Sequence, residues 1–172
     1  IRNAFEIWKR EGLSLSPMIQ TDVQTARHLV DKGYVAENSA GELVGTFSLD
    51  KGSISRDASG SIQFIEGDHQ PISFSAYDSI SIASSERLLV FKKAAVRLDL
   101  ANSGLGKQLY RLAETIGREN GFDGMVLETV KEARWLYEWY VKLGFQPIGS
   151  HRYPSSQIDT VLMIKRFDRD LK

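Results

Sequence analysis

The sequence predicts a single α+β domain in which helices flank a mixed, mostly antiparallel central sheet. Its 172 residues suit one hydrophobic core, and 42% hydrophobic and 26% charged residues are usual for a globular protein. The second half alternates strand and helix patterns, which implies a parallel strand pair within the sheet. Because no repeat or linker divides residues 1–172, we expect one domain.

The first half of the chain predicts two helices followed by a hairpin. A short helix is expected over residues 3–11, and Thr21 or Asp22 can cap a second helix; a glycine ends each of them. Two β-rich runs at about residues 34–38 and 43–50 flank a glycine-containing turn. This pattern predicts an antiparallel hairpin.

Residues 51–86 differ from the rest of the chain in composition. They are rich in serine and glycine and carry little apolar mass for their length. Residues 61–65 and 72–76 are short enough and apolar enough to form strands. We interpret 51–86 as a surface insertion in the domain, of the kind that forms a hairpin and shapes a pocket.

The second half gives the clearest periodicities. Apolar residues recur at three- and four-residue steps through two segments and so predict amphipathic helices, while β-rich runs surround them. The expected elements are a long strand at 88–98, a helix at 103–120, a strand at 125–130, a helix at 131–143 and a closing hairpin at 145–153 and 159–167.

The residue inventory excludes several classes of protein. Lys plus Arg and Asp plus Glu both number 22, which argues against a nucleic-acid sleeve or a polybasic membrane-surface protein. Without cysteine, the chain has no disulfide scaffold, zinc–cysteine cluster or thiol catalysis. No run of 18 apolar residues and no signal peptide is present, so we expect a cytoplasmic protein with no membrane partner.

The segment ANSGLGKQL at 101–109 is the sharpest local signal, because it lies where a strand becomes a helix. The first N–H groups of a helix lack internal acceptors, and the helix dipole favours anions there. Gly104 and Gly106 would let a pyrophosphate approach the backbone, with Lys107 beside it. Gln108 does not fit a Walker A loop and Leu109 does not fit a dinucleotide fingerprint. A helix start that uses glycine only for tight packing stays an alternative.

The order of these elements resembles the GNAT superfamily of N-acetyltransferases over about residues 88–167. In that family a Q/R-x-x-G-x-G/A loop holds the pyrophosphate of acetyl-coenzyme A, and the segment WYVKLGF at 139–145 resembles another family motif. The resemblance also implies that main-chain groups at the end of the preceding strand bind the pantetheine arm. The residues implied to bind the cosubstrate are Ala94, Ala95, Val96, Asn102, Ser103, Gly104, Leu105, Gly106, Lys107 and Gln108.

Two positions depart from the family pattern. The first position of the loop motif is Ala101 instead of Gln or Arg, which removes a side chain but leaves the backbone cradle. Many members carry Asn seven residues before the motif tyrosine, where this chain has Ala133. That contact is either missing or supplied by Lys131 or Arg134.

Tyr140 is the residue to which the resemblance assigns proton donation to the departing thiolate, four residues before Gly144. A core aromatic residue on an amphipathic helix is the alternative. Glu128 is the candidate base, because a carboxylate inside the apolar strand MVLETV is unusual and burial raises a carboxyl pKa. The alternative is an exposed carboxylate or one paired with Lys92 or Lys93. A backbone N–H near Val96 would meet the oxyanion.

The remaining charged and aromatic residues suggest weaker hypotheses. His28, His69 and His151 lack metal-ligand spacing, so we expect no metal site. His151, Arg152 and Tyr153 would either line the acceptor groove or form a surface turn. Lysine and arginine residues gather in sequence around the proposed phosphate site, as Lys92, Lys93, Arg97 and Lys107.

These observations lead to an enzyme that moves acetyl from acetyl-coenzyme A directly to a primary amine. Without cysteine, no covalent cysteine intermediate can form. The sequence does not choose among three classes of acceptor: protein amines, small amines such as polyamines or aminoglycosides, and aminoacyl-tRNA. We expect no other nucleic-acid partner. The oligomeric state is also open, a homodimer included. Two alternatives are a non-catalytic acyl-coenzyme A sensor or interaction module and a nucleotide-binding domain.

Overall fold

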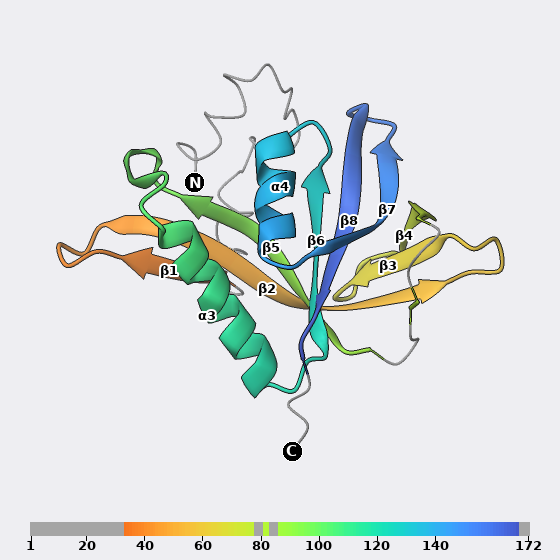
Figure 1. The fold of residues 1–172 in the computed structure, drawn as a ribbon, viewed down its shortest axis with the longest axis horizontal. Coiled ribbons are helices and arrows are strands. Elements are labelled where there is room, and N and C mark those ends of the chain that lie inside the picture. The colour runs from red at the N-terminus through yellow and green to blue at the C-terminus, as the bar shows by residue number, and fades with distance from the viewer. Residues whose placement is uncertain (1–32, 78–80, 83–85, 169–172) are drawn as a thin grey trace. The chain divides into compact units, whose positions relative to one another are not determined.

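The computed structural model describes residues 33–77, 81–82 and 86–168 (Figure 1). The helices predicted over residues 3–11 and from Thr21 onward lie outside the described residues. The described elements are β1 (Gly33–Glu37), β2 (Leu43–Arg56), β3 (Ile62–Glu66), β4 (Ile72–Ala76), β5 (Leu88–Val96), η1 (Leu98–Leu100), α3 (Leu105–Glu119), β6 (Gly124–Val130), α4 (Arg134–Lys142), β7 (Gln146–Tyr153) and β8 (Ile158–Arg166).

The strands form one mixed sheet. They pair in the order β1-β2-β3-β4-β7-β8-β6-β5, and β2 also pairs with β5. β5 and β6 are parallel, with Leu88–Val90 opposite Gly124–Val126. Pairing is antiparallel between β1 and β2, β2 and β3, β3 and β4, β4 and β7, β7 and β8, and β8 and β6. The predicted mixed, mostly antiparallel sheet with its parallel pair is therefore confirmed.

The contacts divide the chain into two compact units. Among the described residues the first unit comprises 33–49 and 91–115, and the second comprises 50–77, 81–82, 86–90 and 116–168. β2, β5 and α3 thus contribute residues to both units. That residues 1–172 form a single domain stays a prediction.

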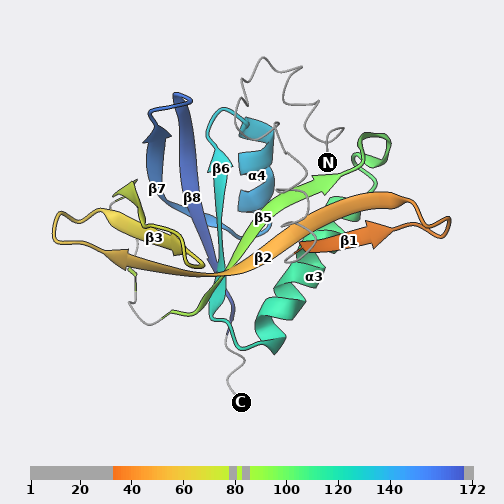
Figure 2. The same ribbon diagram turned by 180° about the vertical axis from the view of Figure 1, so that it is seen from behind.

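The first unit is built around aromatic rings. β1 and the start of β2 form the predicted hairpin (Figure 2), in which Tyr34 stacks on Phe47 with ring centroids 4.8 Å apart. Phe47 contacts Phe91 of β5, and Phe91 in turn meets the edge of Tyr110 of α3. Phe47, Phe91 and Tyr110 are all buried, and burying each such side chain stabilises the fold by roughly 1.5–3 kcal/mol. This stack fixes the start of α3 against β2 and β5.

The second unit encloses an apolar core to which seven strands contribute. The strands β6, β7 and β8 lie side by side in Figures 1 and 2, and α4 lies beside β6. The core side chains, one or two from each strand, are Ile54, Ile62, Phe64, Phe74, Leu88, Val90, Val126, Ile148, Leu162 and Ile164. The predicted closing hairpin at 145–153 and 159–167 is confirmed as β7 and β8.

Residues 51–86 are more integrated than their composition predicts. β2 continues through Gly52 to Arg56, and the strands expected at 61–65 and 72–76 are confirmed as β3 and β4. Ile54, Ile62, Phe64 and Phe74 of this segment are buried in the core. The prediction that the whole segment lies at the surface is therefore wrong for these four side chains. A few apolar residues are enough to contribute to the core when they alternate along paired strands. That the segment is an insertion stays a prediction.

Candidate functional site

The glycine loop lies in the first unit and opens α3. Its backbone turns at two residues with positive φ, Asn102 at 64° and Gly104 at 88°. The first α-helical hydrogen bond runs from the Gln108 N–H to the Gly104 carbonyl, over 3.1 Å. Ser103 Oγ accepts the Leu105 N–H at 3.3 Å. The N–H groups of Gly106 and Lys107 come before this first helical hydrogen bond. They therefore have the position from which the start of a helix binds an anion.

The start of α3 depends on a close approach to β2. A Cβ placed on Gly45 would lie 2.8 Å from Leu109 Cδ1 and 3.2 Å from the Ala95 carbonyl oxygen. Leu105 Cδ2 lies 3.7 Å from the same point. Glycine at position 45 therefore lets the first turns of α3 sit directly on β2 and beside β5, which places the glycine loop.

The end of β5 carries a backbone irregularity that sequence analysis missed. Lys93 has a φ of 55°, which is uncommon for a residue other than glycine. The strand's alternation breaks there, because Lys93 and Ala94 are both exposed before Ala95 turns inward. The only sequence signal was two adjacent lysines in an apolar strand. The Arg97 N–H donates to the Val44 carbonyl at 2.8 Å, so an oxyanion donor near Val96 would have to be another N–H.

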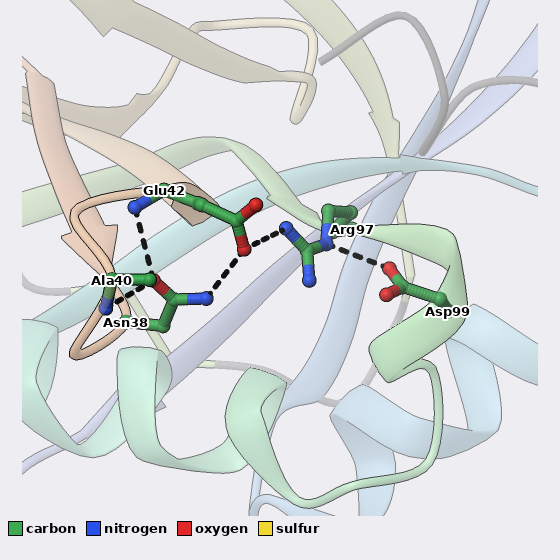
Figure 3. A network of polar contacts seen from close by, with 5 residues as sticks. All are labelled: Asn38, Ala40, Glu42, Arg97 and Asp99. Carbon is green, nitrogen blue, oxygen red and sulfur yellow. Dashed lines mark hydrogen bonds and ion pairs between the residues drawn. The ribbon is translucent and has the colours of Figure 1, made fainter.

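Arg97 does not contribute its charge to a basic patch at the loop. Its Nε lies 2.8 Å from Asp99 Oδ1 and its guanidinium lies 3.2 Å from Glu42 Oε2, as Figure 3 shows. Asn38 Nδ2 donates to the same Glu42 oxygen at 2.7 Å. Hydrogen bonds from Asn38 and then Arg97 lower the pKa of the Glu42 carboxyl. Of the four cations that the sequence placed near the phosphate site, Arg97 is balanced by two carboxylates, while Lys93 and Lys107 are exposed.

Glu128 lies in the second unit, on the face of β6 that also carries core residue Val126. Thr160 Oγ1 donates to Glu128 Oε1 at 2.5 Å, and the Tyr153 hydroxyl donates to Oε2 at 3.1 Å. Burial raises the pKa of the Glu128 carboxyl, while these hydrogen bonds and the nearby His151 oppose the rise. The alternative of an exposed carboxylate is wrong, and a carboxyl with a raised pKa matches what a general base needs.

The partners of Glu128 come from the closing hairpin. Thr160 of β8 stands opposite His151 of β7, and Tyr153 follows two residues later on the same face. The His151 and Tyr153 rings meet edge to face at 4.5 Å, and His151 Nδ1 lies 2.8 Å from the Ser73 carbonyl oxygen, which makes it the donor. His151 and Tyr153 therefore belong to a cluster around Glu128. The sequence shows that His151 and Tyr153 are two residues apart and so share a face of a strand. Only the register of β7, β8 and β6 shows that this face carries Glu128.

Tyr140 is buried on α4 in the same unit. Its ring meets Phe145 edge to face at 5.7 Å and lies 5.1 Å from the Trp139 ring. Burial raises the pKa of its hydroxyl above the ordinary tyrosine value, at which the group is already protonated at neutral pH. Within residues 33–77, 81–82 and 86–168, no hydrogen bond engages this hydroxyl. Among the described residues, Tyr140 is thus a packed aromatic residue whose protonated hydroxyl makes no hydrogen bond.

Comparison with solved structures identifies the fold. A GNAT-family acetyltransferase from Staphylococcus aureus Mu50 is 19% identical, with a TM-score of 0.58 over 96% of this chain and 89% of that protein. A GNAT-family acetyltransferase from Listeria monocytogenes 4b F2365 is 16% identical, with a TM-score of 0.57 over 96% and 84%. The chain has the fold of the GNAT acetyltransferases. The resemblance in fold that the glycine loop and the WYVKLGF segment predicted is confirmed.

A further GNAT structure was determined with its ligand. The GNAT-family acetyltransferase from Elizabethkingia anophelis, with acetyl-CoA bound, is 15% identical, with a TM-score of 0.54 over 86% of this chain and 85% of that protein. No protein-family model matches the chain, and no curated protein sequence does so either. The likeness is therefore one of fold at low sequence identity.

The two departures from the GNAT sequence pattern have different surroundings. Ala101 is exposed, so a longer side chain has room there. Ala133 is fully buried where α4 begins, and it makes no side-chain cap. Of the two residues considered as its substitutes, Arg134 bonds Glu138 at 3.0 Å and Lys131 is exposed.

The described residues show neither a metal cluster nor a membrane-spanning helix. No three His, Asp or Glu side chains gather as a metal site in the part of the chain that the structure describes. None of the helices in that part is both long enough and apolar enough to cross a bilayer. His28 lies outside the described residues.

Proposed function

We propose that this protein is an acetyl-coenzyme A-dependent N-acetyltransferase that transfers acetyl directly to a primary amine. The observation that carries the proposal is a glycine-rich helix start, at the end of a strand with irregular backbone, in a chain with the GNAT fold. The acetyl-CoA bound to the Elizabethkingia anophelis neighbour supports this choice of cosubstrate.

The glycine loop fits a pyrophosphate. A Cβ placed on Gly104 would meet no atom within 4 Å, and the residue is exposed, so the loop is open to a ligand. The N–H groups of Gly106 and Lys107 and the partial positive charge of the helix start favour an anion there. We assign the pyrophosphate to Asn102–Gln108 and the pantetheine arm to the main chain of Ala94–Val96.

Glu128 would take a proton from the acceptor. A primary amine is largely an ammonium ion at neutral pH, and it cannot attack a carbonyl until it loses a proton. The two contacts recorded for the Glu128 carboxylate are with hydroxyl donors, so an ammonium would supply the positive charge that these donors do not provide. This favours acceptors that arrive as cations.

Tyr140 would supply a proton to the departing sulfur. The nitrogen–carbon bond forms, the carbon–sulfur bond breaks, and the thiolate takes the hydroxyl proton of Tyr140. The nitrogen loses two protons: one passes through Glu128 to solvent, and the other restores the Tyr140 hydroxyl, whose own proton went to the sulfur. The hydroxyl of Tyr140 is protonated at neutral pH, as an ordinary tyrosine is, and burial raises its pKa further.

A thermal-shift screen followed by an amine panel tests this function. We expect acetyl-CoA to raise the midpoint of thermal unfolding, whereas ATP and NAD leave it unchanged. Thiol release from acetyl-CoA is then measured with a polyamine, an aminoglycoside, a peptide N-terminus and an aminoacyl-tRNA. We expect release with at least one of them. Binding without release would favour the acyl-coenzyme A sensor, and stabilisation by ATP or NAD instead would favour a nucleotide-binding domain.

A Tyr140→Phe variant then tests the proton donor. We expect kcat to fall at least tenfold with the acceptor found in the panel, because the thiolate loses its acid. Tyr34→Phe is the matched control, since its ring stacks on Phe47 in the first unit. Full activity of Tyr140→Phe would contradict the role given to this residue.

A further inference from the structure

The carboxylate of Glu128 is held by one hydroxyl on each oxygen, from two different strands. Thr160 of β8 reaches Oε1 at 2.5 Å, and Tyr153 of β7 reaches Oε2 at 3.1 Å. Thr160 is buried and Tyr153 is half-buried. Two hydrogen bonds to the two oxygens define the plane of a carboxylate, and they leave two of its four acceptor sites for another donor.

In the part of the chain that the structure describes, the arginines of β7 and α4 bond other carboxylates, and His151 is the basic group whose charge acts on Glu128. On β7, Tyr153 and His151 face it, while Arg152 points to the other face and bonds Asp159 of β8 at 3.2 Å. On α4, which contacts β6, Arg134 bonds Glu138. β4 (ISFSA) carries no charged residue. The Ser73 carbonyl of β4 holds His151 through Nδ1.

This arrangement differs from a structural ion pair. A carboxylate buried for stability is normally matched by a lysine or arginine. Here two hydroxyl donors hold it, one on each oxygen, and two of its four acceptor sites remain for a further donor. The geometry therefore keeps the carboxylate oriented while leaving it able to accept a proton.

We propose that Tyr153 and Thr160 are positioning residues, which orient the Glu128 carboxylate so that its unused acceptor sites take the proton of the acceptor amine. The inference rests on the proposed acetyl transfer and adds two residues to it. Neither hydroxyl touches the reacting atoms; each acts through Glu128. The loss of either hydroxyl should therefore matter only while Glu128 is present.

A double-mutant cycle on the acetyl transfer reaction tests the coupling. We expect Tyr153→Phe to lower kcat about tenfold in the wild-type background and less than twofold in the Glu128→Gln background, with the KM for acetyl-CoA unchanged. Thr160→Val should behave in the same way, and Thr160→Ser, which restores a hydroxyl, should recover kcat to within about twofold. Tyr34→Phe is again the control. An equal loss from Tyr153→Phe in both backgrounds would overturn the proposal.

A titration of the carboxyl itself gives a readout that needs no turnover. The midpoint of Glu128, followed by the NMR signal of its carboxyl carbon, should rise by about half a pH unit or more in Tyr153→Phe, because a hydrogen bond to the charged form is lost. An unchanged midpoint would overturn the positioning role whatever the activity. A raised midpoint in a protein that acetylates no amine would support the positioning role and contradict the proposed function, so the two failures are distinguishable.

Discussion

The glycine loop and the Glu128 cluster are built on opposite principles. The loop offers main-chain N–H groups at an exposed helix start, and Arg97, which precedes it in sequence, is bonded to carboxylates. The cluster offers side chains on neighbouring strands of the second unit, half-buried or buried and bonded to one another. A main-chain site tolerates changes of side chain as long as the backbone keeps its path, whereas a side-chain site depends on each residue it contains.

This difference explains why the departures at Ala101 and Ala133 are compatible with the proposed function. Both remove side chains that many family members carry, while the glycines of the loop, Gly104 and Gly106, are present. At Glu128 no such tolerance is expected, since an amide cannot accept a proton at neutral pH. The contrast yields predictions with effects of different size.

The largest effect is expected for Glu128→Gln. Glutamine keeps the volume and can still accept a hydrogen bond from Thr160, but it cannot take a proton from the acceptor. We expect kcat to fall by about 10²–10⁴, the usual contribution of a general base. The measurement is steady-state thiol release with the acceptor found in the panel, with Tyr34→Phe as the control.

The pH at which the reaction is measured separates this role from simple damage to the fold. A wild-type rate that rises with pH through the pKa of Glu128, and a Glu128→Gln rate that does not, would support the base. A Glu128→Gln variant with wild-type kcat would remove Glu128 from the mechanism while leaving the loop assignment intact.

A smaller effect is expected in the loop, from Gly104→Ala. The added methyl meets no atom within 4 Å, so the cost lies in the backbone, which has a φ of 88°. Forcing an L-residue there costs about 1–2 kcal/mol, which corresponds to roughly a tenfold weaker Kd for acetyl-CoA when the bound loop needs this conformation. Isothermal titration calorimetry measures the change.

Ala101→Gln is the opposite test of the same loop. Its side chain has room because Ala101 is exposed, and it restores the residue type that the family pattern has there. We expect a Kd for acetyl-CoA that is about two to five times tighter, the size of one hydrogen bond. If Gly104→Ala binds acetyl-CoA as tightly as Ala101→Gln does, the loop does not hold the cosubstrate.

Local sequence patterns predicted the elements of both regions, and long-range register explains what they missed. The periodicity of Leu105, Leu109 and Leu112 gave α3 to within two residues at its start. Glu128 stood out because it interrupts an apolar strand. Its partners Tyr153 and Thr160 lie 25 and 32 residues away, and a one-residue slip between β7 and β8 would send Tyr153 to the other face.

The backbone at Lys93 and the path of residues 51–86 were harder to predict. A positive φ at a lysine has no sequence signature, because residues with a Cβ ordinarily adopt negative φ. The segment KGSIS has few apolar residues, yet β2 runs through it because Gly52 allows Val90 to approach. At Gly52 a contact between distant segments decides the local structure.

The smallest effect concerns stability and the pH at which it is measured. Burial raises the pKa of the Glu128 carboxyl above its ordinary value of 4.5, so the folded chain binds this proton more tightly than the unfolded chain. The stability that the protonated group contributes is therefore fully present below pH 4.5 and is lost as the pH rises through the folded-state pKa. Glu128→Gln removes this dependence. The free energy of unfolding of the variant minus that of the wild type should therefore increase as the pH rises from 4.5 to neutrality. Urea unfolding at a series of pH values measures the difference, and Glu132→Gln, which removes an exposed carboxylate, controls for the loss of one negative charge. A difference that is constant with pH would show that the hydroxyls of Thr160 and Tyr153 offset the burial of Glu128 completely.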